Sequence, residues 1–229
     1  MLTQTAARTI SVQPAVRTVR PVPAVSPRGA SSAIEFMGAP MPFARDAEIY
    51  GENEPAEYIY KVISGTVRTY KVLNDGRRQI GAFYLPGDTF GLEVGDVHTF
   101  SAEAIVDAKV LVIKRSSVIG LAARDTAVAR ELWTMTAGEL QRVQDHILLL
   151  IKTAQERVAG FLLEMASRFP KSDEISLPMS RQDIADYLGL TIETVSRTLT
   201  QLENSAAIAV PTSRRIVLRN RNALNRLNG

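Results

Sequence analysis

The chain of 229 residues contains no cysteine. Without thiols it can form no disulfide bond, no thiolate zinc site and no cysteine-ligated iron–sulfur cluster. Histidine is scarce as well, since only His98 and His146 are present and they lie far apart in the sequence. A histidine-based metal site therefore has little support, and we expect the protein to carry no metal and no cofactor.

The sequence also lacks an apolar run approaching the roughly twenty residues that a membrane-spanning helix needs. No apolar segment followed by a small-residue cleavage site indicates a secretory signal peptide. With 45% hydrophobic and 22% charged residues, the composition is that of an ordinary globular protein, long enough for two modest domains. We expect a cytoplasmic protein that does not contact a membrane.

Three arrangements typical of enzymes are missing too. The sequence suggests no nucleophile beside a base, no pair of catalytic carboxylates and no glycine-rich loop that cradles phosphate. We therefore predict that the protein is not an enzyme.

Charge is distributed unevenly along the chain. Residues 1–32 hold four arginines, four prolines and no acidic residue, and we expect them to form a flexible arm. Residues 176–229 hold seven arginines against four acidic residues, whereas residues 33–175 are acidic on balance. A basic C-terminal module on an acidic body fits a protein that presents one end to phosphate.

What the chain does contain is a helix-turn-helix pattern between Ser180 and Glu203. Ser180 is suited to cap the first helix, because its hydroxyl can accept from the free backbone N–H groups and a carboxylate follows at Asp183. Gly189 ends that helix, since glycine adopts positive φ without strain. Thr191 then caps the second helix. The apolar positions expected on the buried faces are Ile184, Ala185 and Leu188 in the first helix and Val195, Leu199 and Leu202 in the second.

The opposite face of the second helix carries Ile192, Glu193, Ser196 and Arg197 near its N-terminus. In a helix-turn-helix this end meets the edges of DNA bases. Arg197 can bond guanine O6 and N7, Glu193 can accept from cytosine N4, and Ile192 can cover a thymine methyl group. Two amphipathic helices with a solvated polar face are the alternative interpretation of this pattern.

The motif Glu193-Thr194-Val195-Ser196-Arg197, preceded by Arg181-Gln182-Asp183-Ile184-Ala185 and Leu188-Gly189-Leu190-Thr191, resembles the DNA-binding motif of the CRP/FNR superfamily. This version of the motif is similar to that of the FNR and FixK branch, in particular the rhizobial FixK-type activators. Similarity extends from about Ala44 to the C-terminus. Because cysteine is absent, oxygen sensing through a cysteine-bound cluster, as in FNR-type sensors, is excluded.

The resemblance implies a homodimer that binds a palindromic operator of the TTGAT-N4-ATCAA type and contacts RNA polymerase. Arg197 and Glu193 would recognise one G·C pair, while Ser196 and Ile192 would tune the neighbouring A·T positions. We expect phosphate contacts from seven further residues: Ser180, Arg181, Gln182, Thr191, Thr194, Ser213 and Arg214. Activation without a small-molecule effector is the expected outcome. The alternatives are repression, decided by operator position, and a ligand-dependent regulator that uses the pocket of the β-roll.

Short alternating segments between about Ala44 and Lys114 predict an antiparallel sandwich or roll, with a hairpin turn at Asn74-Asp75-Gly76. By resemblance it is the β-roll of cyclic-nucleotide-binding-like sensor domains. Family members that bind a nucleotide have a Phe-Gly-Glu segment followed by an arginine, and this chain has Phe90-Gly91-Leu92-Glu93 and then His98-Thr99. We expect no nucleotide binding, and we interpret His98 as a hydrogen-bonded or surface side chain.

Helical periodicity runs from about Asp125 to Lys152 without a proline. Such a helix spans on the order of 40 Å, more than one small roll can cover, so an aliphatic face should meet a partner. By resemblance this is the dimerisation helix; an intramolecular packing helix is the alternative. The residues expected at the dimer interface are Leu132, Leu140, Val143, Ile147, Leu150 and Ile151.

A further helix is predicted over Gln155–Phe169, and a β-hairpin with Ser213 and Arg214 at its tip should form the wing. The predicted fold is α+β, with an N-terminal antiparallel β-roll, a long dimerisation helix and a C-terminal winged helix-turn-helix. We divide the chain into an arm (1–32), a sensor-like roll (33–124), the dimerisation helix (125–153) and the DNA-binding domain (154–229).

Overall fold

The computed structural model describes residues 33–169 and 173–228, so the predicted arm lies outside the described residues. The elements follow one another in this order: η1 (Glu35–Met37), β1 (Ala39–Phe43), β2 (Glu48–Tyr50), β3 (Tyr58–Ser64), β4 (Val67–Val72), β5 (Arg78–Tyr84), β6 (Thr89–Phe90), β7 (Ser101–Ala104), β8 (Ala108–Lys114), α1 (Arg115–Ala122), α2 (Thr126–Leu150), α3 (Ala154–Arg168), β9 (Glu174–Ser176), α4 (Arg181–Leu188), α5 (Ile192–Asn204), β10 (Ile208–Thr212), β11 (Arg215–Leu218) and α6 (Arg221–Asn228).

Two four-stranded antiparallel sheets form the predicted roll, with strand orders β1-β8-β3-β6 and β2-β7-β4-β5. The turn at Asn74-Asp75-Gly76 joins β4 to β5, and Gly76 there has φ +81°. Aromatic and aliphatic side chains from both sheets fill the space between them, including Tyr50, Tyr60 and Phe90. The antiparallel roll is confirmed.

Strand β1 was not predicted, because its sequence Ala-Pro-Met-Pro-Phe holds two prolines. It pairs with β8 alone, at the edge of its sheet. Proline is tolerated on an edge strand, where a missing N–H donor breaks no interior ladder. Sequence periodicity cannot distinguish such an edge strand from a loop.

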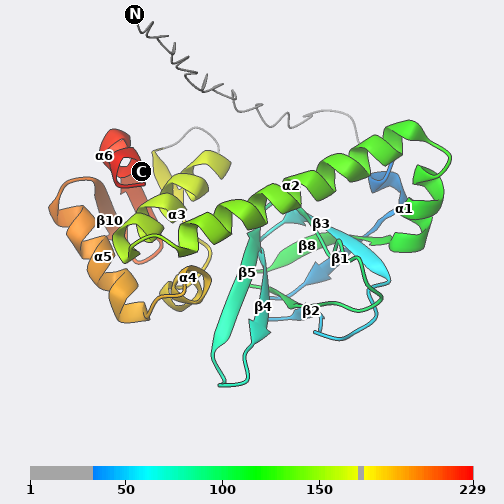
Figure 1. Ribbon diagram of the computed structural model, residues 1–229, viewed down its shortest axis with the longest axis horizontal. Helices are drawn as coiled ribbons and strands as arrows, with labels where there is room; N and C mark the ends of the chain where they lie inside the picture. The colour runs from blue at the N-terminus through cyan, green and yellow to red at the C-terminus, as the bar shows by residue number, and fades with distance from the viewer. Residues whose placement is uncertain (1–32, 170–172, 229) are drawn as a thin grey trace, which may run out of the picture. The chain divides into compact units, whose positions relative to one another are not determined.

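The long helix predicted from about Asp125 is α2. Asp125 caps it by accepting a hydrogen bond from the Ala127 N–H over 2.8 Å. Figure 1 shows α2, in green, as one uninterrupted helix beside the sheets of the roll. No helix in the described part of the chain combines the length and apolar character needed to cross a bilayer.

The C-terminal part consists of α3 to α6 and a small sheet of order β10-β11-β9. Thr153 and Glu156 form a capping box at the start of α3. The core of this part continues into the roll, because Ile80, Phe83 and Ile105 pack in the same apolar cluster as the helices. The winged helix-turn-helix predicted from the sequence is confirmed, and its core is shared with the sensor-like roll.

Candidate nucleic-acid interface

Helix α4 begins and ends as its sequence predicts. The Ser180 hydroxyl accepts from the Asp183 N–H over 3.1 Å, and the Asp183 carboxylate accepts in return from the Ser180 N–H over 2.9 Å. At the other end Gly189 takes a left-handed conformation with φ +61°. A tight turn then leads to Thr191, whose hydroxyl accepts from the Thr194 N–H over 3.2 Å and caps α5.

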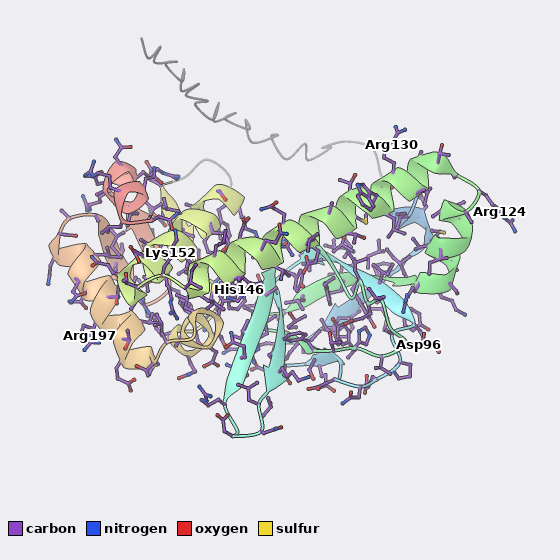
Figure 2. All side chains as sticks on the ribbon, viewed as in Figure 1. Asp96, Arg124, Arg130, His146, Lys152 and Arg197 are labelled. Carbon is purple, nitrogen blue, oxygen red and sulfur yellow. The ribbon has the colours of Figure 1, made fainter. Side chains whose placement is uncertain are left out.

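The two faces of α5 separate as predicted. Val195, Leu199 and Leu202 are buried in the core that α5 shares with α3 and α4. Figure 2 shows Arg197 on α5, on the side of the helix turned away from α2. The four side chains predicted to contact bases are all solvent-exposed and lie within the first two turns of the helix: Ile192, Glu193, Ser196 and Arg197.

The residues predicted to contact phosphate differ in their solvent exposure and in their hydrogen bonds. Gln182 is exposed and donates to Asp186 over 2.6 Å, while the hydroxyls of Thr191 and Thr194 bond each other over 3.0 Å. Arg181 is half-buried, its Nη1 is buried without a hydrogen-bond partner among the described residues, and burial lowers the pKa of its guanidinium. Ser180 is half-buried at the cap of α4.

Ser213 and Arg214 form the exposed turn between β10 and β11. The Arg214 carbonyl accepts from the Leu177 N–H over 2.7 Å, which fixes the turn against the segment that leads into α4. The wing tip is therefore presented to solvent by a backbone that is itself hydrogen-bonded.

The side chains predicted for the dimer interface divide into two groups on α2. The first group is exposed and recurs at helical spacing: Leu140, Val143, Ile147 and Ile151. Leu148 was not predicted, and it is exposed next to Ile147. Leu132 instead packs, half-buried, against the cluster that includes Ile34 and Val118, and Leu150 is half-buried. Val143 and Ile147 of the exposed group line a cavity together with Leu150. Helical periodicity identified the apolar residues but could not show which of them the same chain covers.

A cavity of about 390 Å³ lies between the roll and α2. Apolar groups such as Phe90, Phe100 and Val143 line it, together with the carboxylates of Glu93 and Glu139. Among the described residues that line this cavity, none is a lysine or an arginine. A phosphate is bound by guanidinium groups and backbone donors, so this lining suits an anion poorly.

Glu93 occupies part of this cavity wall and accepts hydrogen bonds from the backbone and the hydroxyl of Thr99. The hydroxyl of Tyr84 donates to Glu139 over 2.8 Å. Burial raises the pKa of Tyr84 and of Tyr50, so both phenols stay protonated at neutral pH.

The interpretation of His98 as a hydrogen-bonded or surface side chain was wrong. His98 is buried, and neither ring nitrogen has a hydrogen-bond partner within the described residues. Its Nδ1 lies 3.6 Å from Glu93 Oε1, too far for a hydrogen bond, and its ring stacks on Tyr50 with the centroids 3.6 Å apart. Burial lowers the pKa of His98 despite the carboxylate nearby, so the ring behaves as part of the aromatic core.

Known protein families match both halves of this arrangement. Residues 156–227 match the Crp-like helix-turn-helix domain, and residues 40–125 match the cyclic nucleotide-binding domain. The nitrogen fixation regulation protein FixK of Azorhizobium caulinodans is 51% identical over 203 residues, which cover 86% of this chain and 82% of that protein. The chain belongs to the CRP/FNR family of transcription regulators.

Solved structures of CRP/FNR proteins agree with this assignment. The structure of FixK2 from Bradyrhizobium japonicum has a TM-score of 0.81 and 56% sequence identity, and the match covers 84% of this chain and 98% of that one. A CRP-family transcriptional regulator from Thermus thermophilus has a TM-score of 0.69 and 30% identity, with coverage of 82% and 96%. The chain is thus a FixK-like CRP/FNR regulator with a DNA-binding helix-turn-helix, and not an enzyme.

Proposed function

We propose that this regulator is a homodimeric transcription activator that binds a palindromic operator of the TTGAT-N4-ATCAA type. The observation that carries the proposal is the position of Glu193 and Arg197, exposed side by side at the start of α5. A guanidinium and a carboxylate one helical turn apart match the guanine and cytosine edges of one base pair in the major groove. Ser196 and Ile192 would then adjust the preference at the adjacent A·T pairs.

Dimerisation is supported by the exposed face of α2. Leu140, Val143, Ile147 and Ile151 together form an apolar stripe that water would otherwise hydrate. Two copies joined along this stripe would be related by a two-fold axis, and their recognition helices would lie about one DNA turn apart, roughly 34–36 Å. A palindromic operator follows from that symmetry.

Backbone contacts would hold the dimer on the duplex without selecting a sequence. We assign them to the start of α4 and to the wing tip, where Arg181, Gln182, Ser213 and Arg214 lie. The protein would act in the cytoplasm and recruit RNA polymerase.

The cavity beside α2 is lined by carboxylates, and none of the described residues in that lining is a lysine or an arginine, which supports activity without a nucleotide effector. The volume of about 390 Å³ nevertheless favours one second candidate, a regulator controlled by a small neutral molecule. An operator-binding assay with purified protein and no additive separates the two candidate functions, because a ligand-dependent regulator would bind the operator only when its small molecule is present.

The decisive experiment is a titration of purified full-length protein against a TTGAT-N4-ATCAA duplex, followed by gel shift. The matched control duplex exchanges the G·C pair in each half-site and keeps all other positions. We expect tight binding of the first duplex and a loss of at least tenfold on the second. Equal affinity for the two duplexes would remove the operator assignment.

A further inference from the structure

Two arginines of the roll reach across to the first helix of the helix-turn-helix. Arg68 of β4 donates from Nη1 to Asp183 Oδ1 over 2.6 Å. Arg78 of β5 donates from Nη2 to the same oxygen over 2.7 Å and from Nε to Asp186 Oδ2 over 2.8 Å. Asp183 is only 4% exposed, so these charge-assisted bonds are formed largely away from water.

The carboxylate of Asp183 is completely engaged. Its Oδ1 accepts from both arginines, while its Oδ2 accepts from the backbone and the hydroxyl of Ser180. Arg68 is held in turn by both oxygens of Glu103 on β7, each 3.0 Å from its Nη2. Asp183, the second residue of the α4 capping box, is therefore also the residue through which the roll holds α4, and removing one arginine would leave its buried carboxylate with a single cation.

The opposite end of α4 is also held from outside the helix-turn-helix. His146 of α2 lies with Nε2 2.8 Å from the carbonyl oxygen of Tyr187 (Figure 2). Arg157 of α3 donates to the carbonyl of Leu188 over 2.8 Å. A cation at the C-terminal carbonyls and a carboxylate at the N-terminus both favour the helix dipole. Helix α4 is thus fixed at each end by partners on β4, β5, α2 and α3.

Fixing α4 fixes the recognition helix. Only Gly189 and Leu190 separate α4 from the Thr191 cap of α5, and the two helices share one core. The side chains of Glu193 and Arg197 stay solvent-exposed in this arrangement, and Glu193 lines a groove together with Arg77 and Arg78 of the roll. The contacts therefore hold α5 in one orientation relative to the roll, with Glu193 and Arg197 exposed to solvent.

We propose that Arg68 and Arg78 are positioning residues for DNA binding, which rests on the proposed function. They touch no DNA; through Asp183 and Asp186 they keep the helix-turn-helix in the single orientation that a dimer needs to engage both half-sites. When that orientation is populated only in part, the apparent affinity falls by the same fraction. The DNA-binding module of this chain is accordingly not independent of its sensor-like roll.

The test compares Arg78→Gln, Asp186→Asn and the double variant in operator-binding titrations at salt concentrations between about 50 and 200 mM. Arg78 is suited to it because its side chain is 27% exposed, so its replacement leaves no fully buried cavity. The matched control is Arg77→Gln, at the neighbouring arginine, whose side chain pairs with Asp75 two residues away and is 77% exposed. Arg78→Lys keeps the charge but loses the fork that bonds two carboxylates.

Arg78→Gln and Asp186→Asn should each lower the affinity for the operator about tenfold. The double variant should lose no more affinity than either single variant, and Arg77→Gln should bind like the wild type. Arg78→Lys should recover part of the loss. The dependence of affinity on salt should keep its wild-type slope in all variants, because a positioning residue releases no counterions from DNA. A merely structural role would lower thermal stability without this pattern, so melting temperature and dimer content are measured alongside.

Three results would overturn the inference: unchanged affinity in Arg78→Gln and Asp186→Asn, a gain in affinity, or a shallower salt dependence. A gain would mean that the contacts restrain the regulator, and a shallower slope would mean that Arg78 contacts phosphate directly. Failure of the wild-type protein to bind the operator would instead contradict the proposed function, so the two failures are distinguishable.

Discussion

The ring of His146 on α2 stacks on the ring of Tyr187 on α4, with centroids 4.0 Å apart and planes 9° from parallel. The same histidine lies within hydrogen-bonding distance of the Tyr187 carbonyl. Burial lowers the pKa of His146, and the bond to the carbonyl opposes that shift only in part. The contact between the long helix and the helix-turn-helix therefore includes a histidine whose burial favours the neutral form.

Stability should consequently fall as pH drops below about 6.5, the ordinary pKa of histidine. In that range the unfolded chain takes up a proton on His146 and the folded chain does not, so protonation favours unfolding. His146→Gln removes this contribution, and the free energy of unfolding should decline less between pH 7.5 and 5.5 than in the wild type. Denaturant titrations of both proteins at three pH values measure this change in the free energy of unfolding.

His98 provides the internal comparison, because burial lowers its pKa as well. His98→Gln should flatten the same pH dependence, and the double variant should flatten it further. A wild-type protein equally stable at pH 7.5 and 5.5 would show that neither histidine has the environment described.

Two glycines should respond to alanine in opposite directions. Gly189 has φ +61°, a conformation that L-residues adopt with strain, and Gly189→Ala should lower the free energy of unfolding by about 1–2 kcal/mol. Gly138 is an exposed residue in the middle of α2, and a Cβ added there meets no atom within 4 Å. Gly138→Ala should raise the free energy of unfolding by about 0.5–1 kcal/mol. Urea denaturation at one protein concentration tests both, and a shift of the same sign in the two variants would contradict the assignment.

Local signals in the sequence were enough to predict the helix-turn-helix. Ser180, Asp183 and Gly189 act within a few residues of one another, so their roles follow from chain order. Strand β1 was not predicted, because its pairing partner β8 lies about seventy residues away along the chain and its prolines hide the alternation typical of a strand.

The bonds from Arg68 and Arg78 to Asp183 could not have been predicted. The partners are 115 and 105 residues apart, and each arginine lies on a strand where it resembles an ordinary surface residue. The same limit applies to His98, because its stacking on Tyr50 is a product of tertiary packing. Single-sequence patterns specify which residues can be buried, and the fold decides what covers them.

If the apolar stripe on α2 forms the proposed dimer interface, a charge placed on it should weaken association. Ile147 is 57% exposed, so Ile147→Asp should leave the fold of each subunit intact while burying an unpaired carboxylate in the proposed interface. Ile119 on α1, which is 52% exposed, offers a matched control away from the stripe. Sedimentation equilibrium should show weaker association for Ile147→Asp and wild-type behaviour for Ile119→Asp. Two variants that associate equally well would place the interface elsewhere.

The lining of the cavity beside α2 predicts that cyclic nucleotides do not bind. Glu93 would face a ligand phosphate, Glu139 is already paired with Arg142 over 2.8 Å, and the described residues of the lining include no lysine or arginine that could bind the phosphate. A ligand at about 100 times its dissociation constant would stabilise the fold by about 2.7 kcal/mol. Millimolar cyclic AMP or cyclic GMP should therefore leave the melting temperature unchanged. A reproducible rise with either nucleotide would restore the ligand-dependent alternative.

We predict that Arg197 contributes to sequence discrimination at one base pair of the operator. Arg197→Ala removes a guanidinium that we expect to bond guanine O6 and N7, and the loss should be about 1–3 kcal/mol per half-site. Because the lost contact is specific, the difference in affinity between the original operator and the duplex with the exchanged G·C pair should shrink, with Glu193 left to provide the remainder. Arg181→Ala removes a predicted phosphate contact instead, so it should weaken binding to both duplexes by the same factor. Fluorescence anisotropy with the two duplexes separates these outcomes. If Arg197→Ala kept the wild-type ratio between the duplexes, the exposed guanidinium on α5 would not be the group that distinguishes G·C from C·G.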